Sequence, residues 1–412
     1  FVREALKNKA NYCVVQKNIK KVNKKKLIKY SSTISFLNKL AVLKRGNSNS
    51  KVIAITGSSG KTTLKTILGK TLSEFGKTYF SKKSYNNHIG VPLSLCNLEN
   101  NHKYSVFEIG MSSSGEIRKL SNLVKPDIAI ITNIGEAHIK NFSNLDGIAK
   151  AKSEIIENIN KDGYLILNRD DKYFNYLSKI AKKKKINVLS FSKTNKSNAQ
   201  LVENKLYKNY NYLHFRVLNK NIYLKIKDTN SLTISNILFT LLTLHILDLD
   251  LTKIINFSNY FQSVEGRGKM HLITRYKKKF HLIDESYNAN PSSVKNAINN
   301  FTNIKRKHKN KFLLLGDMLE LGKNSDKYHE NLAYIINHSD IDKLFVYGKN
   351  AFKTYQKTYK SKQGNILQNL NDFDEIFSNI INKGDYLMVK GSNATGLNRL
   401  SKSIILGHKY VI

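Results

Sequence analysis

Cysteine, proline and tryptophan are scarce in this chain of 412 residues, which contains two, three and none of them, respectively. The two cysteines, Cys13 and Cys96, cannot build a disulfide framework or a cysteine-rich metal cluster, and they fit a reducing cytoplasm. Asn, Ile and Tyr are abundant instead, a joint bias typical of a genome rich in A and T. Hydrophobic residues still make up 41% of the chain, so the composition predicts an ordinary globular protein with room for two or three domains.

A long hydrophobic run is also missing. The longest apolar stretch, around Asn236 to Leu251, is interrupted by polar residues such as His245 and Asp248. A membrane-spanning helix needs about 20 predominantly apolar residues in a row, so this stretch predicts a buried helix and no stable membrane insertion. No signal peptide is visible and the chain opens with Phe1, so we expect a cytoplasmic protein or a fragment that lacks its true start.

Acidic residues are few, 30 against 69 basic ones, and the net charge is +39. Such a charge raises the hypothesis of a nucleic-acid-binding ATPase, which we keep as the alternative from a different class. The basic residues are mostly Lys and are scattered, whereas a nucleic-acid protein would cluster them on one element, with Arg prominent or aromatics interleaved. We therefore expect no nucleic acid as the main ligand, although the charge can steer anionic nucleotides toward a cleft.

Short apolar runs alternate with helical patterns from residue 51 onward, which predicts an α/β fold with parallel sheets covered by helices on both faces. Residues 47–264 form one predicted unit and residues 265–412 a second, Rossmann-like one, while residues 1–46 read as a helix, a strand at 12–15 and a Lys-rich helical stretch before a polar linker at 46–50. Residues 196–228 predict an antiparallel edge, followed by a helix from Ser231 to Leu249. The other predicted strands are Val52–Thr56, Tyr104–Ile109, Ile128–Asn133, Gly163–Asn168, His281–Asp284, Phe312–Gly316, Lys343–Tyr347 and Tyr386–Lys390.

The strongest motif is a glycine-bearing turn between a predicted strand and the predicted helix Lys61–Phe75: Thr56-Gly57-Ser58-Ser59-Gly60-Lys61-Thr62-Thr63. Such a turn lets successive backbone N–H groups point at a phosphate from the positive end of a helix. Lys61 would neutralise the β- and γ-phosphates of ATP, and the Thr62 hydroxyl would coordinate Mg²⁺. Ile55 stands where the full Walker pattern has its first glycine, so this is a shorter variant. Kinases, hydrolases and ligases all use such loops, and the reaction stays open at this point.

Three residues downstream could serve the same site. Glu108 ends a predicted strand, where a magnesium ligand beside a phosphate loop belongs, although a surface glutamate is the simpler alternative. His138 also follows a strand, but a histidine there is more often structural. Lys152 lies on a predicted helix, and one lysine carries almost no signal in a chain so rich in lysine.

The phosphate loop and the segments around Glu108 and His138 together resemble the Mur ligase family. Further resemblance lies in Asn86-Asn87-His88-Ile89-Gly90-Val91-Pro92-Leu93, Asp284-Glu285-Ser286-Tyr287-Asn288-Ala289-Asn290-Pro291-Ser292, Gly316-Asp317-Met318-Leu319-Glu320-Leu321-Gly322 with His329, and Val389-Lys390-Gly391-Ser392. The first two of these resemble signatures of the members that add D-alanyl-D-alanine. They argue against the nearest alternatives, a sister ligase that adds another amino acid and a folylpolyglutamate-type ligase.

The resemblance implies an ATP-dependent amide ligase that joins D-alanyl-D-alanine to UDP-N-acetylmuramoyl-tripeptide through an acyl phosphate. It implies two Mg²⁺ ions, one held by Thr62 and Glu108, the other with help from His138. Lys152 matches a carbamoylated lysine that serves as a metal ligand. The implied catalytic residues are therefore Lys61, His138 and Lys152, in a central P-loop ATPase domain. The protein is expected to be a monomer.

The resemblance also assigns nucleotide contacts outside the loop. Asn236 matches a nucleotide-contacting Asn, Arg267 marks the hinge into the last domain, and Tyr287, Asn288 and Asn290 would close over the nucleotide. The chain departs from the family at Leu232-Thr233 (commonly His-Asn), Asn393 (commonly Arg) and Ser84 (frequently Asn). Residues 1–46 resemble only the end of the family's UDP-binding N-terminal α/β domain, so we expect that domain to be truncated.

Overall fold

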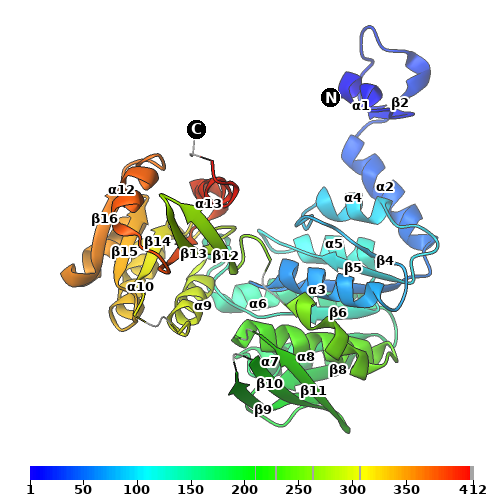
Figure 1. Cartoon of the computed structure of the whole chain (residues 1–412). Coiled ribbons are helices and arrows are strands. Elements are labelled where there is room, and N and C mark those ends of the chain that lie inside the picture. Colours follow the sequence, from blue (N-terminus) through cyan, green and yellow to red (C-terminus); the bar gives the residue numbers. More distant parts are fainter. Residues whose placement is uncertain (209, 228–229, 262–263, 306–307, 409–412) are drawn as a thin grey trace.

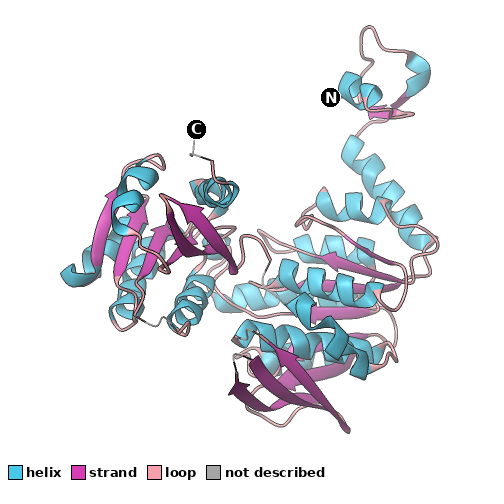
Figure 2. Ribbon diagram, in the orientation of Figure 1, coloured by secondary structure: helices cyan, strands magenta, loops and turns pink. Residues whose placement is uncertain are grey.

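The structure is a computed structural model that describes residues 1–208, 210–227, 230–261, 264–305 and 308–408. It contains a two-stranded, a nine-stranded and a six-stranded sheet. Figures 1 and 2 show a small N-terminal piece raised on helix α2, the large sheet with its helices below it, and the C-terminal unit to one side. Within the described residues, no helix is both long enough and apolar enough to cross a bilayer.

The N-terminal piece is built from few residues. Its elements are α1 (Val2–Lys7), β1 (Cys13–Val15), the 3-10 turn η1 (Lys24–Lys26), β2 (Leu27–Lys29) and α2 (Thr33–Gly46). Strands β1 and β2 pair in parallel. The prediction of a Lys-rich helix was partly wrong, because strand β2 lies within that stretch and α2 begins only at Thr33. The Ser32 hydroxyl caps α2 by accepting a hydrogen bond from Ser35 N. The predicted polar linker is packed rather than free: Ser48 and Ser50 are buried, and Ser50 Oγ lies 2.9 Å from Ser105 Oγ.

The nine-stranded sheet has the order β11-β10-β9-β8-β7-β6-β3-β5-β4. Its strands are β3 (Lys51–Thr56), β4 (Thr78–Phe80), β5 (Tyr104–Glu108), β6 (Ile128–Ile131), β7 (Tyr164–Asn168), β8 (Asn187–Ser192), β9 (Ala199–Tyr207), β10 (Tyr210–Val217) and β11 (Lys220–Ile226). Strands β9 to β11 pair antiparallel and the others parallel, so the predicted antiparallel edge is confirmed. Strands β4 and β8 were missed by the prediction.

Helices cover both faces of this sheet, as predicted. They are α3 (Lys61–Ser73), α4 (Gly90–Cys96), α5 (Glu116–Val124), η2 (Ile139–Asn141), α6 (Leu145–Ser153), η3 (Glu154–Asn158), α7 (Phe174–Lys183), α8 (Ser231–Ile246) and η4 (Leu251–Phe261). Alternate residues of β3 feed two cores: Ile53 and Ile55 pack with α3 and α8, while Val52 and Ala54 pack on the other face. Because side chains alternate along a strand, β3 is buried on both sides.

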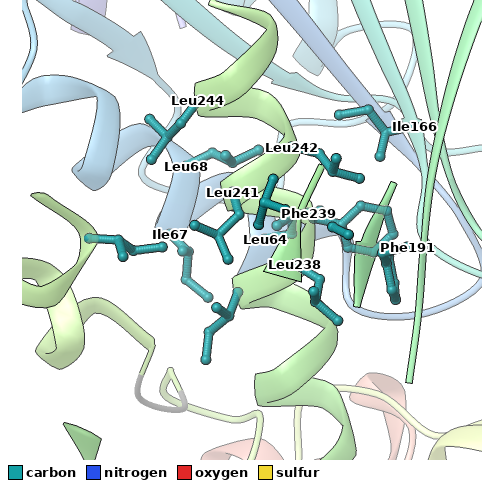
Figure 3. Packing of buried hydrophobic residues seen from close by; sticks show 14 of the residues in the cluster. Leu64, Ile67, Leu68, Ile166, Phe191, Leu238, Phe239, Leu241, Leu242 and Leu244 are labelled. Carbon is teal, nitrogen blue, oxygen red and sulfur yellow. The ribbon is translucent and has the colours of Figure 1, made fainter. Parts of the chain in front are cut away.

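Helix α8 confirms the predicted buried helix. Its residues Leu238, Leu241 and Leu242 are fully buried, in one cluster with Leu64, Ile67 and Leu68 of α3, Ile166 of β7 and Phe191 of β8, as Figure 3 shows. Phe239 meets Phe191 of β8 edge to face, with ring centroids 4.6 Å apart. Such aromatic pairs add about 0.5–1.5 kcal/mol beyond their burial. The helix that carries the predicted nucleotide contact Asn236 is therefore fixed in the core.

The six-stranded sheet has the order β12-β13-β17-β14-β15-β16, with only β12 antiparallel. Its strands are β12 (Lys269–Arg275), β13 (Lys278–Glu285), β14 (Lys311–Gly316), β15 (Lys343–Tyr347), β16 (Gln363–Leu367) and β17 (Tyr386–Lys390). Its helices are α9 (Pro291–Thr302), η5 (Gly322–Asn324), α10 (Ser325–Asn337), α11 (Ala351–Lys357), η6 (Lys360–Lys362), α12 (Asp372–Ile380), η7 (Asn393–Thr395) and α13 (Leu397–Leu406). The Rossmann-like expectation is confirmed, although β12 and β16 were not predicted.

This second sheet also separates two cores by alternation. Leu313 and Leu315 of β14 pack with α9, α10 and α11, whereas Phe312 and Leu314 pack with α12 and α13. The carboxyl ends of the parallel strands β13, β14 and β17 lie side by side, because these strands are neighbours in the sheet. In such sheets ligands approach this end, so the loops after these strands are the ones to examine.

Candidate active site

The phosphate loop joins β3 to α3, and two of its residues must be glycine. Gly57 has φ +143°, and a Cβ there would lie 1.8 Å from Thr132 Oγ1. Gly60 has φ +82° and is the residue before the first turn of α3. Residues other than glycine rarely adopt such φ angles, so the loop conformation depends on both glycines. The first N–H groups of α3 have no partner within the helix and point out of its N-terminus toward the loop.

The loop after β6 braces the phosphate loop. Ser58 N donates to Asn133 O at 3.0 Å, and Ser59 N donates to Asn133 Oδ1 at 3.0 Å. The Ser58 hydroxyl donates to Gly135 O and accepts from Gly135 N, both at 2.8 Å. The backbone N–H groups of Ser58 and Ser59, which we predicted to bind phosphate, are thus engaged within the protein. The backbone N–H groups from Gly60 to Thr63 have no hydrogen-bond partner among the described residues, so these are the groups available to a phosphate.

Lys61 lies over the loop rather than extending into solvent. Its Nζ donates to the carbonyl oxygen of Gly57 at 2.7 Å. Burial lowers the pKa of Lys61, Glu108 opposes this effect, and Arg267 adds to it. The Gly57 carbonyl is a neutral acceptor, whereas a phosphate bound at the loop would give this ammonium an anionic acceptor and a stronger hydrogen bond.

Glu108 confirms its predicted place at the end of β5 but is not a surface residue, since only 2% of it is exposed. Its Oε2 accepts from the Thr62 hydroxyl at 2.8 Å. Its Oε1 accepts from the Ser84 hydroxyl and from Asn86 Nδ2, both at 2.8 Å. Lys65 Nζ lies 3.9 Å from Oε2. The two carboxylate oxygens therefore have different surroundings, one facing Thr62 and the other held by amide and hydroxyl donors.

The charge state of Glu108 follows from these neighbours. Burial alone would raise the pKa of Glu108, but Lys61, the Thr62 hydroxyl, Arg267 and Lys65 together lower it below its usual value. The carboxyl group is consequently an anion at neutral pH. An anionic oxygen beside a hydroxyl oxygen is a donor pair that suits a hard divalent cation.

The sequence analysis did not identify two residues of this site, Ser84 and Lys65. Ser84 stands where the family frequently has Asn, and its hydroxyl supplies a hydrogen bond to Glu108 despite the change. Lys65 lies on α3 at three and four residues from Thr62 and Lys61, on the same side of the helix. That helical spacing was the signal available in the sequence.

His138 begins the short turn η2 with φ +57°, a left-handed conformation that is uncommon for a non-glycine residue. Its Nδ1 lies 2.5 Å from Oε2 of Glu320, which belongs to the C-terminal unit. If the ring carries its proton on Nδ1, which faces this carboxylate, Nε2 keeps a free lone pair, the usual arrangement for a metal-binding histidine. Burial lowers the pKa of His138 while Glu320 opposes this, so the ring is neutral in most molecules at neutral pH.

Lys152 is buried near the end of α6, with 2% of its surface exposed. Burial lowers the pKa of Lys152 well below its usual value, and the like charge of Lys61 adds to this effect. A neutral amine is the form that reacts with carbon dioxide to give a carbamate. Among the described residues, no group of three His, Cys, Asp or Glu side chains is placed to hold a metal ion.

Asn236 is buried on α8, one turn after Leu232. A Cβ built on Gly60 would lie 3.5 Å from Leu232 Cδ1, so the start of α8 lies directly against the phosphate loop. The apolar Leu232 therefore takes the place of the polar residue that the family commonly has there. The structure places Asn236 on the helix that borders the loop.

Arg267 reaches back from the C-terminal unit to the loop. Its Nη2 donates to the Thr62 hydroxyl oxygen at 3.0 Å, and its guanidinium lies over the ring of Tyr287, 4.3 Å from the centroid. Gly266 has φ +73°, and a Cβ there would lie 2.9 Å from Tyr287 Cβ. Asp284 fixes this turn by accepting from Gly266 N at 2.8 Å. The turn at Gly266 and Arg267 and the ring of Tyr287 are therefore packed against each other.

The other predicted nucleotide contacts of the C-terminal unit are used within that unit. Asn290 begins α9: its Oδ1 accepts from Ser293 N at 2.8 Å, and its own N–H donates to Ser293 Oγ. The backbone oxygen of Asn288 accepts from the buried ammonium of Lys390. Tyr287 and Asn288 are both exposed, Tyr287 with 37% of its surface, whereas Asn290 is buried.

The Gly316–Gly322 segment is held by a buried histidine. His329 accepts the N–H of Met318 at Nε2, 3.0 Å away, and its Nδ1 lies 2.8 Å from the Ser325 carbonyl oxygen. Because Nε2 accepts and Nδ1 faces a carbonyl oxygen, the ring carries one proton, on Nδ1, and is neutral. Burial lowers the pKa of His329, which also favours the neutral ring. Asp317 in the same segment accepts from Asn350 N at 2.9 Å and Ala351 N at 2.7 Å, at the start of α11.

A cleft of about 1150 Å³ lies between the two large units. Its walls are the segment after His138, from Ile139 to Asp146, with Lys172 and Tyr173, and the facing residues Met318 to Ser325 with Tyr328 and Asn350. Lys140 N donates to Glu320 O at 3.0 Å, a contact that joins the two walls. None of the predicted site residues is among the described residues that line this cleft, although its wall begins at Ile139, directly after His138. Of the predicted residues outside the phosphate loop, Glu108 and Arg267 contact it directly, through the Thr62 hydroxyl.

Comparison with known proteins gives consistent matches. Residues 55–244 match the Mur ligase middle domain, and residues 268–393 match the Mur ligase, glutamate ligase domain. The UDP-N-acetylmuramoyl-tripeptide--D-alanyl-D-alanine ligase of Rickettsia prowazekii is 30% identical over 401 residues, which are 97% of this chain and 88% of the relative. A crystal structure of MurF from Acinetobacter baumannii superposes with a TM-score of 0.85 at 26% identity, over 98% of this chain and 87% of that one. MurF from Thermotoga maritima in complex with ADP gives 0.83 at 26% identity, over 98% and 91%.

Proposed function

This chain belongs to the Mur ligase family, and from that premise we propose that it joins D-alanyl-D-alanine to UDP-N-acetylmuramoyl-tripeptide at the expense of ATP. The observation that carries the proposal is the assembly of a phosphate loop, the Thr62–Glu108 pair and the hinge arginine Arg267 at one point of the structure. The two segments that resemble D-alanyl-D-alanine-adding members contribute to it, since Asn86 bonds to Glu108 and Tyr287 stacks on Arg267.

The donor set at the loop fits a magnesium ion. The Thr62 hydroxyl and the anionic Glu108 are oxygen donors in contact with each other, and Mg²⁺ is usually bound by one or two protein oxygens together with substrate phosphates. When bound there, Mg²⁺ would neutralise charge on the triphosphate. We assign Thr62 and Glu108 to one ion, and His138 with a carbamoylated Lys152 to a second.

The reaction follows from positioning and charge neutralisation, without a protein nucleophile. The terminal carboxylate of the tripeptide attacks the γ-phosphorus of ATP, which forms an acyl phosphate and releases ADP. The amine of D-alanyl-D-alanine then attacks the acyl carbon, and inorganic phosphate leaves from the tetrahedral intermediate. The first-turn N–H groups of α3 and the Lys61 ammonium would bind the γ-phosphate and the charge that develops on it.

The C-terminal unit would complete the site over the nucleotide. Arg267 already touches Thr62 in this structure, and Tyr287 lies on its guanidinium. We propose that Tyr287, Asn288 and Asn290 face the nucleotide, with Asn236 on the opposite side. Such a cover keeps water from the acyl phosphate, whose hydrolysis would waste ATP.

The domain limits belong to the same proposal. We propose residues 1–46 as part of a UDP-substrate-binding domain, residues 47–264 as the ATP-binding domain and residues 265–412 as the domain that closes over it. We also propose a cytoplasmic monomer that acts in cell-wall biogenesis, with the roles in cell shape and division that follow from it.

A coupled assay tests the reaction. Phosphate release is measured with the tripeptide precursor, containing either diaminopimelate or lysine at its third position, with and without D-alanyl-D-alanine. We expect release only when ATP, precursor and dipeptide are all present, together with a product whose mass equals precursor plus dipeptide minus water. Phosphate release that is indifferent to the dipeptide would contradict the proposal. Equal turnover with a single amino acid would favour a sister ligase, and stimulation by nucleic acid that declines with salt would favour the other class.

The carbamate on Lys152 has its own test. Removing the side chain in Lys152→Ala should lower turnover strongly, and added bicarbonate or a short carboxylate should restore part of it, because a free anion can enter the space left behind. Lys150→Ala, on the exposed side of the same helix, is the matched control. Electron density that ends at a plain ammonium on Lys152 in a metal-loaded crystal would contradict the assignment.

A further inference from the structure

The helix after the phosphate loop carries a second lysine whose ammonium is sealed inside the protein. The side chain of Lys65 on α3 has 0% of its surface exposed. Its Nζ donates to Ser81 Oγ at 3.1 Å and to the Lys83 carbonyl oxygen at 2.7 Å, and it lies 3.9 Å from Glu108 Oε2. Burying an ammonium is costly unless it is paired and hydrogen-bonded, so these three contacts account for its position.

These contacts join two separate parts of the proposed metal site. Helix α3 carries Thr62, and the segment at 81–84 after β4 carries Ser84. Ser81 Oγ also donates to Lys83 O at 2.9 Å, which folds the segment around the ammonium. Ser84 follows directly and bonds to Glu108 Oε1 at 2.8 Å.

We infer that Lys65 is a positioning residue for the proposed magnesium site. By fixing the segment at 81–84 against α3, its ammonium keeps the Ser84 hydroxyl on Oε1 of Glu108 and leaves Oε2 facing Thr62. Partners behind a metal ligand orient it, and their loss typically weakens metal binding by about 10–100-fold. Lys65 itself touches neither substrate nor metal in this assignment.

Two other roles for Lys65 lead to different results. If it were only a counter-charge for Glu108, its removal would tighten metal binding, because the ammonium and the metal ion repel each other. If it only stabilised the fold, its removal would leave metal binding unchanged. The distances favour positioning, since the two short contacts go to neutral oxygens of Ser81 and Lys83 and the contact to Glu108 is the longest.

The test compares Lys65→Met with the unaltered chain. The probe is Mn²⁺ in the presence of ADP, with free Mn²⁺ measured by electron paramagnetic resonance, so no turnover is needed. We expect the dissociation constant for Mn²⁺ to rise roughly tenfold. In the ligase assay the Mg²⁺ concentration for half-maximal rate should rise by a similar factor, while KM for D-alanyl-D-alanine stays within about twofold.

Lys311→Met is the matched control. Lys311 is also a fully buried lysine, bonded to Thr302 O and Asp340 Oδ2, both at 2.8 Å, but it lies on β14 of the C-terminal unit. This variant should lose stability without changing the Mn²⁺ constant. Ser81→Ala removes one acceptor of the Lys65 ammonium and should raise the constant by a smaller factor.

Each outcome decides the point. A Mn²⁺ constant in Lys65→Met that is unchanged or lower overturns the positioning role. If Lys65→Met does not fold, Ser81→Ala decides, and an unchanged constant there overturns it as well. The inference rests on the proposed function only through the magnesium site. A lack of ligase turnover in the unaltered chain would therefore overturn the proposed function, whereas normal turnover with unchanged Mn²⁺ binding in Lys65→Met would overturn the positioning role alone.

Discussion

The loops at the carboxyl ends of the two large sheets use their polar groups differently. In the nine-stranded sheet, the first turn of α3 leaves its N–H groups for a ligand, and the Lys61 ammonium bonds to the neutral carbonyl oxygen of Gly57. In the six-stranded sheet, Asp317, Asn290 and His329 all bond within their own unit. The first set leaves donors for an anionic ligand, while the second uses its polar groups to stabilise its own loops and helix starts.

This difference separates catalysis from stability. Substitutions in the phosphate loop should change rate with little change in unfolding free energy. Substitutions in the C-terminal loops should change unfolding free energy first and rate only through the position of Arg267 and Tyr287. The four experiments that follow test that separation.

The largest effect is expected for Lys61→Ala. No other side chain of the loop can offset the triphosphate charge, so kcat should fall by at least about 10³-fold. The unfolding free energy should change by less than about 0.5 kcal/mol, since the only bond lost is to the Gly57 carbonyl. Lys70→Ala, exposed on the same helix, controls for the loss of a positive charge. Retained turnover in Lys61→Ala would mean that the site lies elsewhere.

The next largest effect is expected for Asp317→Ala. It leaves the N–H groups of Asn350 and Ala351 at the start of α11 without an acceptor, which should cost about 1–3 kcal/mol of unfolding free energy in urea. Asp326→Ala, an exposed aspartate paired with Lys353 at 3.6 Å, should cost less than about 0.5 kcal/mol. Equal losses in the two variants would contradict the view that this loop holds its unit together.

Asn290 tests both sides of this difference, because it caps helix α9 in the structure and is also proposed to contact the nucleotide. Asn290→Ala should lose about 1 kcal/mol of unfolding free energy as the cap of α9 is removed, and Asn290→Ser should keep most of it. If the amide also faces the nucleotide, KM for ATP should rise in both variants. A rise in KM only in the alanine variant would show that Asn290 acts through the helix alone.

The smallest effect is a pH dependence. Burial lowers the pKa of His329 below its unfolded value, so its contribution to stability is present above about pH 6.5 and is lost as the pH falls toward the folded pKa. Between pH 8 and pH 6 this loss is at most about 0.8 kcal/mol. Burial also lowers the pKa of His102, His271 and His281, so the measurement is the difference in slope between the unaltered chain and His329→Gln. Identical slopes would contradict a neutral His329.

The long apolar strands were predictable because both cores depend on a simple alternation. Strands β3, β5, β6, β14 and β17 are buried on both faces and read as continuous apolar runs. Strand β4 was missed because three residues, none of them fully buried, carry too little pattern. Strand β12 was missed because its Met270 and Leu272 are exposed, so its apolar residues do not mark a buried face.

The site was predictable where it is local and not where it depends on distant partners. The glycines and Lys61 form one continuous motif, and the structure gives each a physical reason. The sequence did not indicate that the N–H groups of Ser58 and Ser59 donate to Asn133, because these hydrogen bonds join two loops that are brought together by the parallel sheet. For the same reason no sequence pattern indicated that Glu320 lies against His138.

The reciprocal hydrogen bonds between Ser58 and Gly135 have a mechanical consequence. They tie the phosphate loop to the segment between β6 and His138, so these two segments are held in a fixed position relative to each other. A movement of the C-terminal unit would therefore leave the conformation of the phosphate loop unchanged. The geometry that decides where the γ-phosphate sits is set once, when the chain folds.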